Sequence, residues 1–164
     1  MMRITPPEKD IELIQEFERG KIKHVLFDFD GTISRLREGW QRIMAPVCVE
    51  MICGDRQPTP AIIEEVDRMI DETTGIQTIF QMQRLEQMVR EHGLVPEDKV
   101  RTPLEYKQVY NDRLMEPVNA RIAEIKAGEK TVEDFLIRGV RRFLDLISQK
   151  EVVLYVFSGT DRDD

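Results

Sequence analysis

The segment Ile22–Thr32 reads IKHVLFDFDGT, and it decides the predicted fold. Its first part is short and rich in β-forming residues, which predicts a strand, and Gly31 predicts a sharp turn after the second carboxylate. Asp28 would end the strand and Asp30 would lie on the turn, so both carboxylates can reach one small site. Two carboxylates so close repel each other unless a cation or a shared proton intervenes. A hard divalent cation with oxygen ligands meets that need.

A second apolar segment, Glu151–Thr160, reads EVVLYVFSGT and predicts another strand. It shows almost no polar alternation, which is typical of a strand covered on both faces. Two such strands joined by helices predict a parallel sheet, whose ligands bind at the carboxyl ends of the strands. We therefore expect the Ser158 hydroxyl and the Gly159 amide near Asp28, where they could hold an anion.

About 100 residues of helical character separate the two strands. Apolar spacing predicts helices over residues 40–52, from Thr59 onward, over 76–89 and over 104–125, the last one broken near Pro117. Two further helices are expected, one before the first strand and one shortly before the second. One begins at a capping box at Thr5 and ends at Gly20. The other follows a cap at Thr131 with Asp134 and buries Val140, Phe143, Leu144 and Ile147.

Composition excludes several classes of function. The chain has 164 residues, with 24 Lys and Arg against 31 Asp and Glu and a net charge of −7, which argues against nucleic-acid binding. No apolar run approaches the roughly 20 residues of a membrane helix. We therefore expect a cytoplasmic protein without membrane partners. Cys48 and Cys53 are interpreted as buried, reduced thiols.

The two strand ends suggest phosphoryl chemistry. An aspartate such as Asp28 is ionised near neutral pH and can attack phosphorus without a base, provided that a cation offsets repulsion from the phosphate oxygens. Asp30, if protonated, can donate a proton to the leaving oxygen and later accept one from water. Glycine at position 159 lets the backbone approach an anion closely.

These motifs, together with the helical insert, resemble the haloacid dehalogenase-like hydrolase superfamily, in a phosphatase branch similar to phosphoglycolate phosphatases. The resemblance implies an α/β fold with a Rossmann-like parallel sheet core, formed by residues 1–34 and 131–164. The same resemblance implies that residues 35–130 form an inserted, all-helical cap domain that closes over the site and selects the substrate.

The resemblance also implies roles for individual residues. Asp28 matches the nucleophile and a Mg²⁺ ligand, and Asp30 matches the general acid/base, with its backbone carbonyl as another Mg²⁺ ligand. Thr32 belongs to the first motif and orders its loop, and Ser158 matches the phosphate-binding residue of the second motif. With Gly159, Thr32 and Ser158 form the expected phosphate-binding group. The substrate would be a small phosphorylated metabolite.

Two departures from the family pattern matter. The family places a lysine and an acidic pair on later strands, whereas this sequence ends six residues after Ser158. We therefore expect a fragment whose sheet core is incomplete and exposes apolar surface, and which could be inactive alone. A sugar-phosphate mutase shares every residue named, and a non-catalytic binding or regulatory remnant is a further alternative. A receiver-type signalling module ranks lower because it lacks a large helical insert.

Two pairs of residues have alternative interpretations. Arg35 and Arg37 follow the first motif and could contact an anionic substrate, although exposed surface charge is the preferred interpretation. Gln77 and Thr78, near the start of a helix, could face the substrate or simply lie on the helix surface. The sequence specifies neither the substrate nor the oligomeric state.

Overall fold

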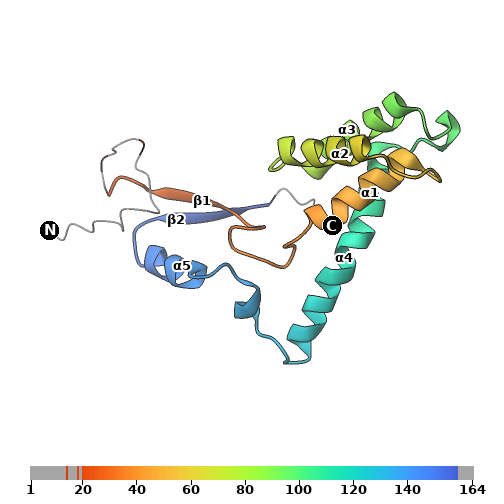
Figure 1. Ribbon diagram of the computed structural model, residues 1–164. Helices are drawn as coiled ribbons and strands as arrows, with labels where there is room; N and C mark the ends of the chain where they lie inside the picture. Colours follow the sequence, from red (N-terminus) through yellow and green to blue (C-terminus); the bar gives the residue numbers. More distant parts are fainter. Residues whose placement is uncertain (1–13, 15–17, 19, 159–164) are drawn as a thin grey trace.

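The computed structural model describes residues 14, 18 and 20–158, and the helix expected from Thr5 lies outside them. The described elements, in chain order, are β1 (His24–Asp28), α1 (Gln41–Cys53), α2 (Pro60–Glu72), α3 (Thr78–His92), η1 (Glu97–Lys99), α4 (Pro103–Lys126), η2 (Val132–Phe135), α5 (Val140–Ser148) and β2 (Val153–Phe157). Figure 1 shows α1 to α4 gathered on one side and the two strands with α5 on the other.

The two predicted strands pair in parallel, as the sequence predicted. The register runs from His24 opposite Val153 to Asp28 opposite Phe157. The described chain is therefore a helix-rich α/β structure with a two-stranded parallel sheet. No helix of the described residues is both long enough and apolar enough to cross a membrane.

The helical region, residues 41–126, has a dense core. α1 packs against α2, α3 and α4, and α3 packs against α4. The side chains of Met44, Ile52, Val66, Leu85 and Met88 are fully buried there. Cys48 and Cys53 are also buried and are not joined in a disulfide, as predicted.

Local capping explains where three of these helices begin or end. The Thr59 hydroxyl accepts a hydrogen bond from the Ile62 amide at the start of α2, and Gly93 ends α3 in the left-handed conformation. Thr102 and Glu105 form a reciprocal capping box at the start of α4. Of these signals, the start at Thr59 is the one that the sequence analysis used.

The predicted break in the last long helix is wrong. α4 runs without interruption from Pro103 to Lys126, with Pro117 inside it. Proline removes one backbone hydrogen bond and crowds the preceding turn. Leu114 and Val118, on either side of Pro117, are buried in the helical core, and their packing offsets that cost.

The strand region, formed by β1, β2 and α5, is packed far less densely. α5 lies along one face of the sheet, where Phe27, Ile33 and Val140 are buried (Figure 1). Elsewhere apolar strand residues are exposed, including Leu26 at 67% and Val156 at 60%. The prediction that both faces of the second strand are covered is therefore wrong for the described residues, whereas the expected exposure of apolar sheet is confirmed.

The predicted buried face of α5 is only partly correct. Val140 is buried, and Leu144 and Ile147 pack against the same small cluster. Phe143 is 50% exposed, and its ring meets Phe27 edge-on at a centroid separation of 6.1 Å. The helical start predicted at Thr131 is a short 3-10 helix, η2, and α5 begins separately after Gly139.

Two linkers, residues 29–40 and 127–139, connect the strand region to the helical region. They meet through backbone hydrogen bonds from the Ile137 amide to the Ile33 carbonyl and from the Arg35 amide to the Phe135 carbonyl. From α4, the Arg121 guanidinium donates to three backbone carbonyls of the first linker, those of Arg35, Leu36 and Glu38. The first linker is thus tied to α4.

Candidate active site at the end of β1

The turn after β1 brings its two acidic residues close to each other in space. The amides of Ile33 and Ser34 both donate to the Phe29 carbonyl, and the Gly31 amide donates to the Ser34 carbonyl at 2.8 Å. Gly31 has a φ of +80°, a conformation that a residue with a side chain rarely adopts. The chain therefore reverses directly after Asp30, as the sequence predicted.

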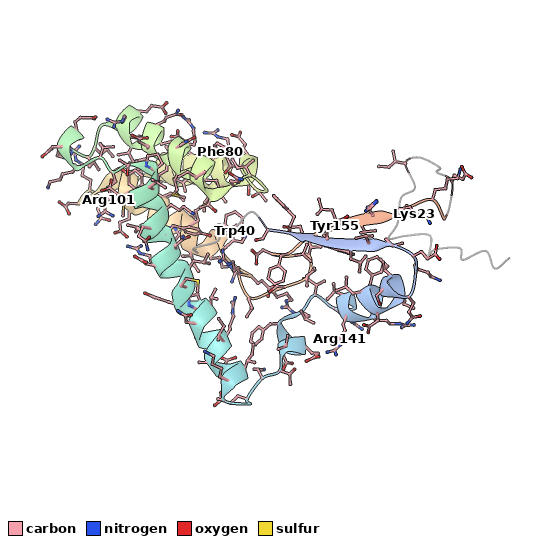
Figure 2. All side chains as sticks on the ribbon, turned by 180° about the vertical axis from the view of Figure 1, so that it is seen from behind. Lys23, Trp40, Phe80, Arg101, Arg141 and Tyr155 are labelled. Carbon is pink, nitrogen blue, oxygen red and sulfur yellow. The ribbon has the colours of Figure 1, made fainter. Side chains whose placement is uncertain are left out.

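Asp28 and Asp30 line one cavity of about 300 Å³, which we call the acid cavity. Its other walls come from the first linker (Arg37, Trp40), the loop between α2 and α3 (Gly75) and the helices α3 and α4 (Thr78, Gln81, Tyr110, Leu114). In Figure 2, Trp40 lies where the helical region approaches the strands. Residues of both the strand region and the helical region therefore line the acid cavity.

Thr32 supports the first carboxylate. Its hydroxyl donates to the Asp28 carboxylate at 3.4 Å, across the turn. This contact lies within the loop that Thr32 is expected to order. Thr32 is not among the residues that line the acid cavity, so a direct contact between Thr32 and a bound phosphate has no support from the cavity lining.

Tyr110 gives the cavity a neutral hydroxyl. Burial raises the pKa of Tyr110 well above its ordinary value of 10, and the nearby Arg37 opposes this, while the charges of Cys48 and Asp30 raise the pKa further. The Tyr110 hydroxyl therefore stays protonated at neutral pH. It can donate a hydrogen bond to an anionic oxygen in the cavity.

The two arginines after the first motif have different positions. Arg37 is half-buried and is the one cationic side chain among the residues that line the acid cavity. Arg35 faces outward, where its guanidinium donates to the Glu38 carboxylate at 2.7 Å and lowers the pKa of Glu38. The preferred interpretation, exposed charge, thus fits Arg35, and the alternative fits the position of Arg37.

Ser158 lies at the same edge of the sheet as Asp28. The register pairs Asp28 with Phe157, so Ser158 comes one residue after the partner of Asp28. Ser158 is half-buried, and it does not line the acid cavity as described. Gly159, the other predicted anion-binding residue of this strand end, lies outside the described residues.

The donor set at the cavity fits a magnesium ion better than a metal held by many protein ligands. The described residues contain no group of three or more His, Cys, Asp and Glu side chains that could hold a metal ion. Mg²⁺ differs from such metals because it keeps several waters and binds through one or two carboxylates plus substrate phosphate. The Asp28 carboxylate, which lines the cavity beside Asp30, could supply the carboxylate of that set, and the Asp30 backbone carbonyl could supply a further oxygen.

Sequence reasoning missed several cavity residues. Trp40 was interpreted as an apolar residue of the first helix, and Tyr110 and Leu114 as part of the long helical segment. Which face of a helix meets a cavity depends on how the helices pack, and periodicity within one segment does not carry that information. Thr78 does line the cavity, whereas its neighbour Gln77 does not.

Comparisons with known proteins found no similarity to report: no protein-family model, no curated protein and no solved structure matches this chain.

Proposed function

We propose that this chain carries the nucleophile end of a magnesium-dependent phosphohydrolase of the haloacid dehalogenase-like type. In this proposal Asp28 forms an aspartyl-phosphate with a small phosphorylated metabolite. Residues 1–34 and 131–164 belong to a Rossmann-like core, and residues 35–130 form the helical cap. The helices of the insert lie in sequence between two strands that pair in parallel, which supports this division.

One observation carries the proposal: the carboxylates of Asp28 and Asp30 line the same cavity, opposite residues of the helical region. If Asp28 and Asp30 were only solvated turn residues, there would be no reason for them to line a cavity together with Trp40 and Tyr110. The Thr32 hydroxyl, 3.4 Å from the Asp28 carboxylate, adds support because it can hold the nucleophile in one orientation.

In the first step the Asp28 carboxylate attacks phosphorus, and the bond from phosphorus to the leaving oxygen breaks. Asp30 donates its proton to that oxygen, so that a neutral alcohol leaves. Mg²⁺, held by the Asp28 carboxylate and the Asp30 backbone carbonyl, would supply positive charge against the phosphate oxygens. Tyr110 and Arg37 can donate hydrogen bonds to an anion in the cavity.

In the second step water attacks the aspartyl-phosphate, and Asp30 accepts the proton of that water. The bond between the Asp28 oxygen and phosphorus breaks, which releases inorganic phosphate and restores both carboxyl groups. In this proposal Ser158, one residue beyond the strand partner of Asp28, holds phosphate oxygens.

The test measures phosphate release from an aryl phosphate with Mg²⁺ present. We expect Asp28→Asn to abolish release, because an amide is not a nucleophile for phosphorus. Asp30→Asn should slow release by about 100-fold or more, the usual scale for an acid/base group. Asp67→Asn is the matched control, because Asp67 is exposed on α2, away from the acid cavity, and should leave the rate unchanged.

A second readout does not require turnover. Beryllium trifluoride mimics a phosphoryl group on a carboxylate, so ¹⁹F NMR should show a bound signal with Mg²⁺ in the parent chain and in Asp67→Asn. Asp28→Asn should lose it. Equal signals or equal rates in the parent and in Asp28→Asn would refute Asp28 as the nucleophile. The absence of a bound ¹⁹F signal from the parent would refute the proposed function, whereas missing turnover alone agrees with the expected incomplete core.

A further inference from the structure

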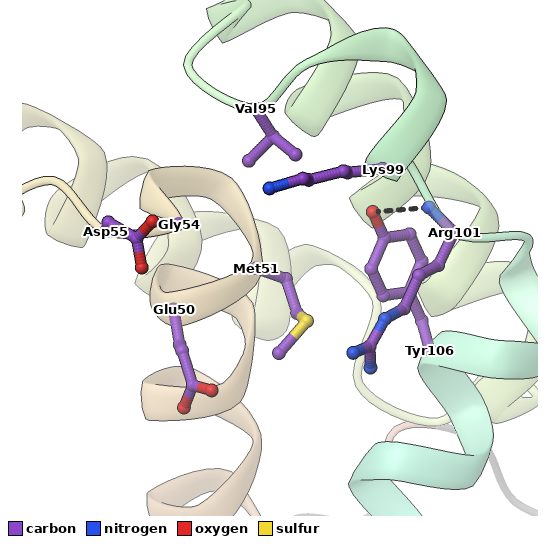
Figure 3. Close-up of a pocket in the computed structure, with 8 residues that line it drawn as sticks. All are labelled: Glu50, Met51, Gly54, Asp55, Val95, Lys99, Arg101 and Tyr106. Atoms are coloured by element: carbon purple, nitrogen blue, oxygen red, sulfur yellow. Dashed lines mark hydrogen bonds between the residues drawn. The ribbon is translucent and has the colours of Figure 1, made fainter.

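A second pocket of about 210 Å³ lies in the helical region, between the end of α1, η1 and the start of α4 (Figure 3). We call it the distal pocket. Arg101, which lines it, lies at the end of the helical region away from the strands (Figure 2). The distal pocket shares no lining residue with the acid cavity, so the proposed phosphohydrolase chemistry does not account for it.

Charged groups of opposite sign line opposite sides of the distal pocket. Lys99 and Arg101 come from the segment before α4, while Glu50 and Asp55 come from the end of α1 (Figure 3). The Glu50 carboxylate already binds Arg113 at 2.7 Å. Among the described residues, neither Lys99 nor Asp55 forms a salt bridge. One cationic and one anionic group thus face the same hollow without neutralising each other.

The surface between these charges is partly apolar. Met51 and Val95 are half-buried and line the pocket, and the ring of the buried Tyr106 closes it. The Tyr106 hydroxyl accepts a hydrogen bond from the Arg101 amide at 3.2 Å, which fixes the backbone that carries the Arg101 guanidinium. In Figure 3 the Met51 side chain extends between the acidic side and the Arg101 guanidinium.

Gly54 keeps the acidic side close to Val95. Its φ is +56°, and a Cβ atom at this position would meet the Val95 Cγ2 atom at 3.3 Å. The end of α1 therefore turns away next to Val95 and presents Asp55 to the pocket. Backbone geometry therefore holds this part of the wall.

We propose that the distal pocket binds a small aliphatic α-amino acid. Its carboxylate would bind Lys99 and Arg101, its ammonium group would bind Asp55, and its side chain would contact Met51 and Val95. A zwitterion offers a negative group to Lys99 and a positive group to Asp55. A simple anion would leave the Asp55 carboxylate without a cationic partner, and a simple cation would leave the Lys99 ammonium group without an anionic one. The volume is below the roughly 300–1,000 Å³ of drug-sized sites, which suits a ligand of this size.

The experiment titrates L-leucine into the full chain and follows binding by calorimetry and by ¹⁵N-resolved amide shifts. We expect saturable binding, with shifts concentrated at residues 54–55 and 99–101. 4-Methylpentanoic acid, which lacks the ammonium group, and 3-methylbutylamine, which lacks the carboxylate, should each bind at least about tenfold more weakly. This is the scale of one charge-assisted hydrogen bond.

Variants assign the binding to the pocket. Lys99→Gln and Asp55→Asn should each weaken leucine binding by about tenfold or more. Lys126→Gln and Asp67→Asn are the matched controls, since both residues are exposed and outside the pocket, and both should bind as the parent does. The proposal is overturned if leucine shows no saturable binding, if 4-methylpentanoic acid binds equally well, or if the two pocket variants bind normally.

Discussion

The helical region and the strand region contain similar apolar side chains but bury them to different extents. In the helical region Met44, Val66 and Leu85 have no exposed surface. In the strand region Leu26 and Val156 remain more than half exposed, although they lie on strands that pair in parallel. Since buried apolar area is the main favourable term in folding, the helical region should supply most of the stability of this chain.

This difference bears on the candidate active site, which lies between the two regions. Asp28 and Asp30 are attached to the weakly buried strand region, whereas Tyr110 and Gln81 belong to the densely packed region. The Gln81 amide is itself fixed, because it donates to the Thr73 hydroxyl at 3.1 Å. The helical wall of the acid cavity is thus the more rigid one, and the geometry of the acids depends on the linkers.

The largest predicted effect comes from a truncation in the helical core. Leu85→Ala removes a fully buried side chain and should lower the free energy of unfolding by about 2–5 kcal/mol. The same substitution at Leu26, which is 67% exposed, should cost less than about 0.5 kcal/mol. Urea unfolding followed by far-UV circular dichroism measures both. Equal losses would contradict the difference in burial between the regions.

Arg121 should show a smaller effect, because it ties the first linker to α4. Arg121→Ala removes donors to the carbonyls of Arg35, Leu36 and Glu38, the last at 3.2 Å, and should cost about 1–3 kcal/mol. Thermal unfolding can be followed by Trp40 fluorescence, since Trp40 is the one tryptophan of the sequence. Arg121→Lys should recover only part of the loss, because an ammonium group lacks the planar fork of a guanidinium.

Both capping boxes begin with threonine, so the same Thr→Ala substitution can be compared in the helical region and in the second linker. Thr102→Ala removes the cap of α4, a helix of 24 residues in the dense region, and should cost about 1 kcal/mol. Thr131→Ala removes the same box from η2, which has four residues and no buried side chain, and should cost less. Urea midpoints at pH 7 measure both. A larger loss for Thr131→Ala would show that the second linker contributes more than its burial indicates.

The Thr102 box also predicts a pH dependence. Hydrogen bonds from the Thr102 amide and hydroxyl lower the pKa of Glu105 below its ordinary value of 4.5. The contribution of the charged Glu105 is therefore fully present above pH 4.5 and is lost as the pH falls through the lower pKa of the folded state. Glu105→Gln should flatten this part of the stability profile, measured by urea unfolding across this pH range.

Much of the fold could be predicted because residues near each helix end in the sequence determine where the helix begins or ends. The start of α2 at Thr59 was predicted, and the same local pattern of threonine followed by proline begins α4 at Thr102. Whether α4 continues through Pro117 depends on the packing of Leu114 and Val118 against other helices, which no local pattern encodes. Coverage of a strand depends likewise on what packs against it.

In the candidate site, too, the residues set by local sequence could be predicted and those set by helix packing could not. Asp28, Asp30 and the Gly31 turn could be predicted, because the residue types and their order determine the local geometry. Tyr110 could not, because its position at the cavity depends on how α4 crosses α1 and α3. The residues that would select a substrate therefore belong to the part of the site that the sequence alone leaves open.

The smallest predicted effect is also the most direct test of the exposed sheet. Val156→Thr replaces a methyl group by a hydroxyl where the side chain is 60% exposed, and it should change the free energy of unfolding by less than about 0.5 kcal/mol. Val66→Thr makes the same change at a fully buried position and should cost about 1–3 kcal/mol, because the hydroxyl loses its water. If Val156→Thr proved as costly as Val66→Thr, the strand would have to be covered in solution. A concentration dependence of the cost, measured alongside sedimentation equilibrium, would then identify a second copy of the chain as the cover.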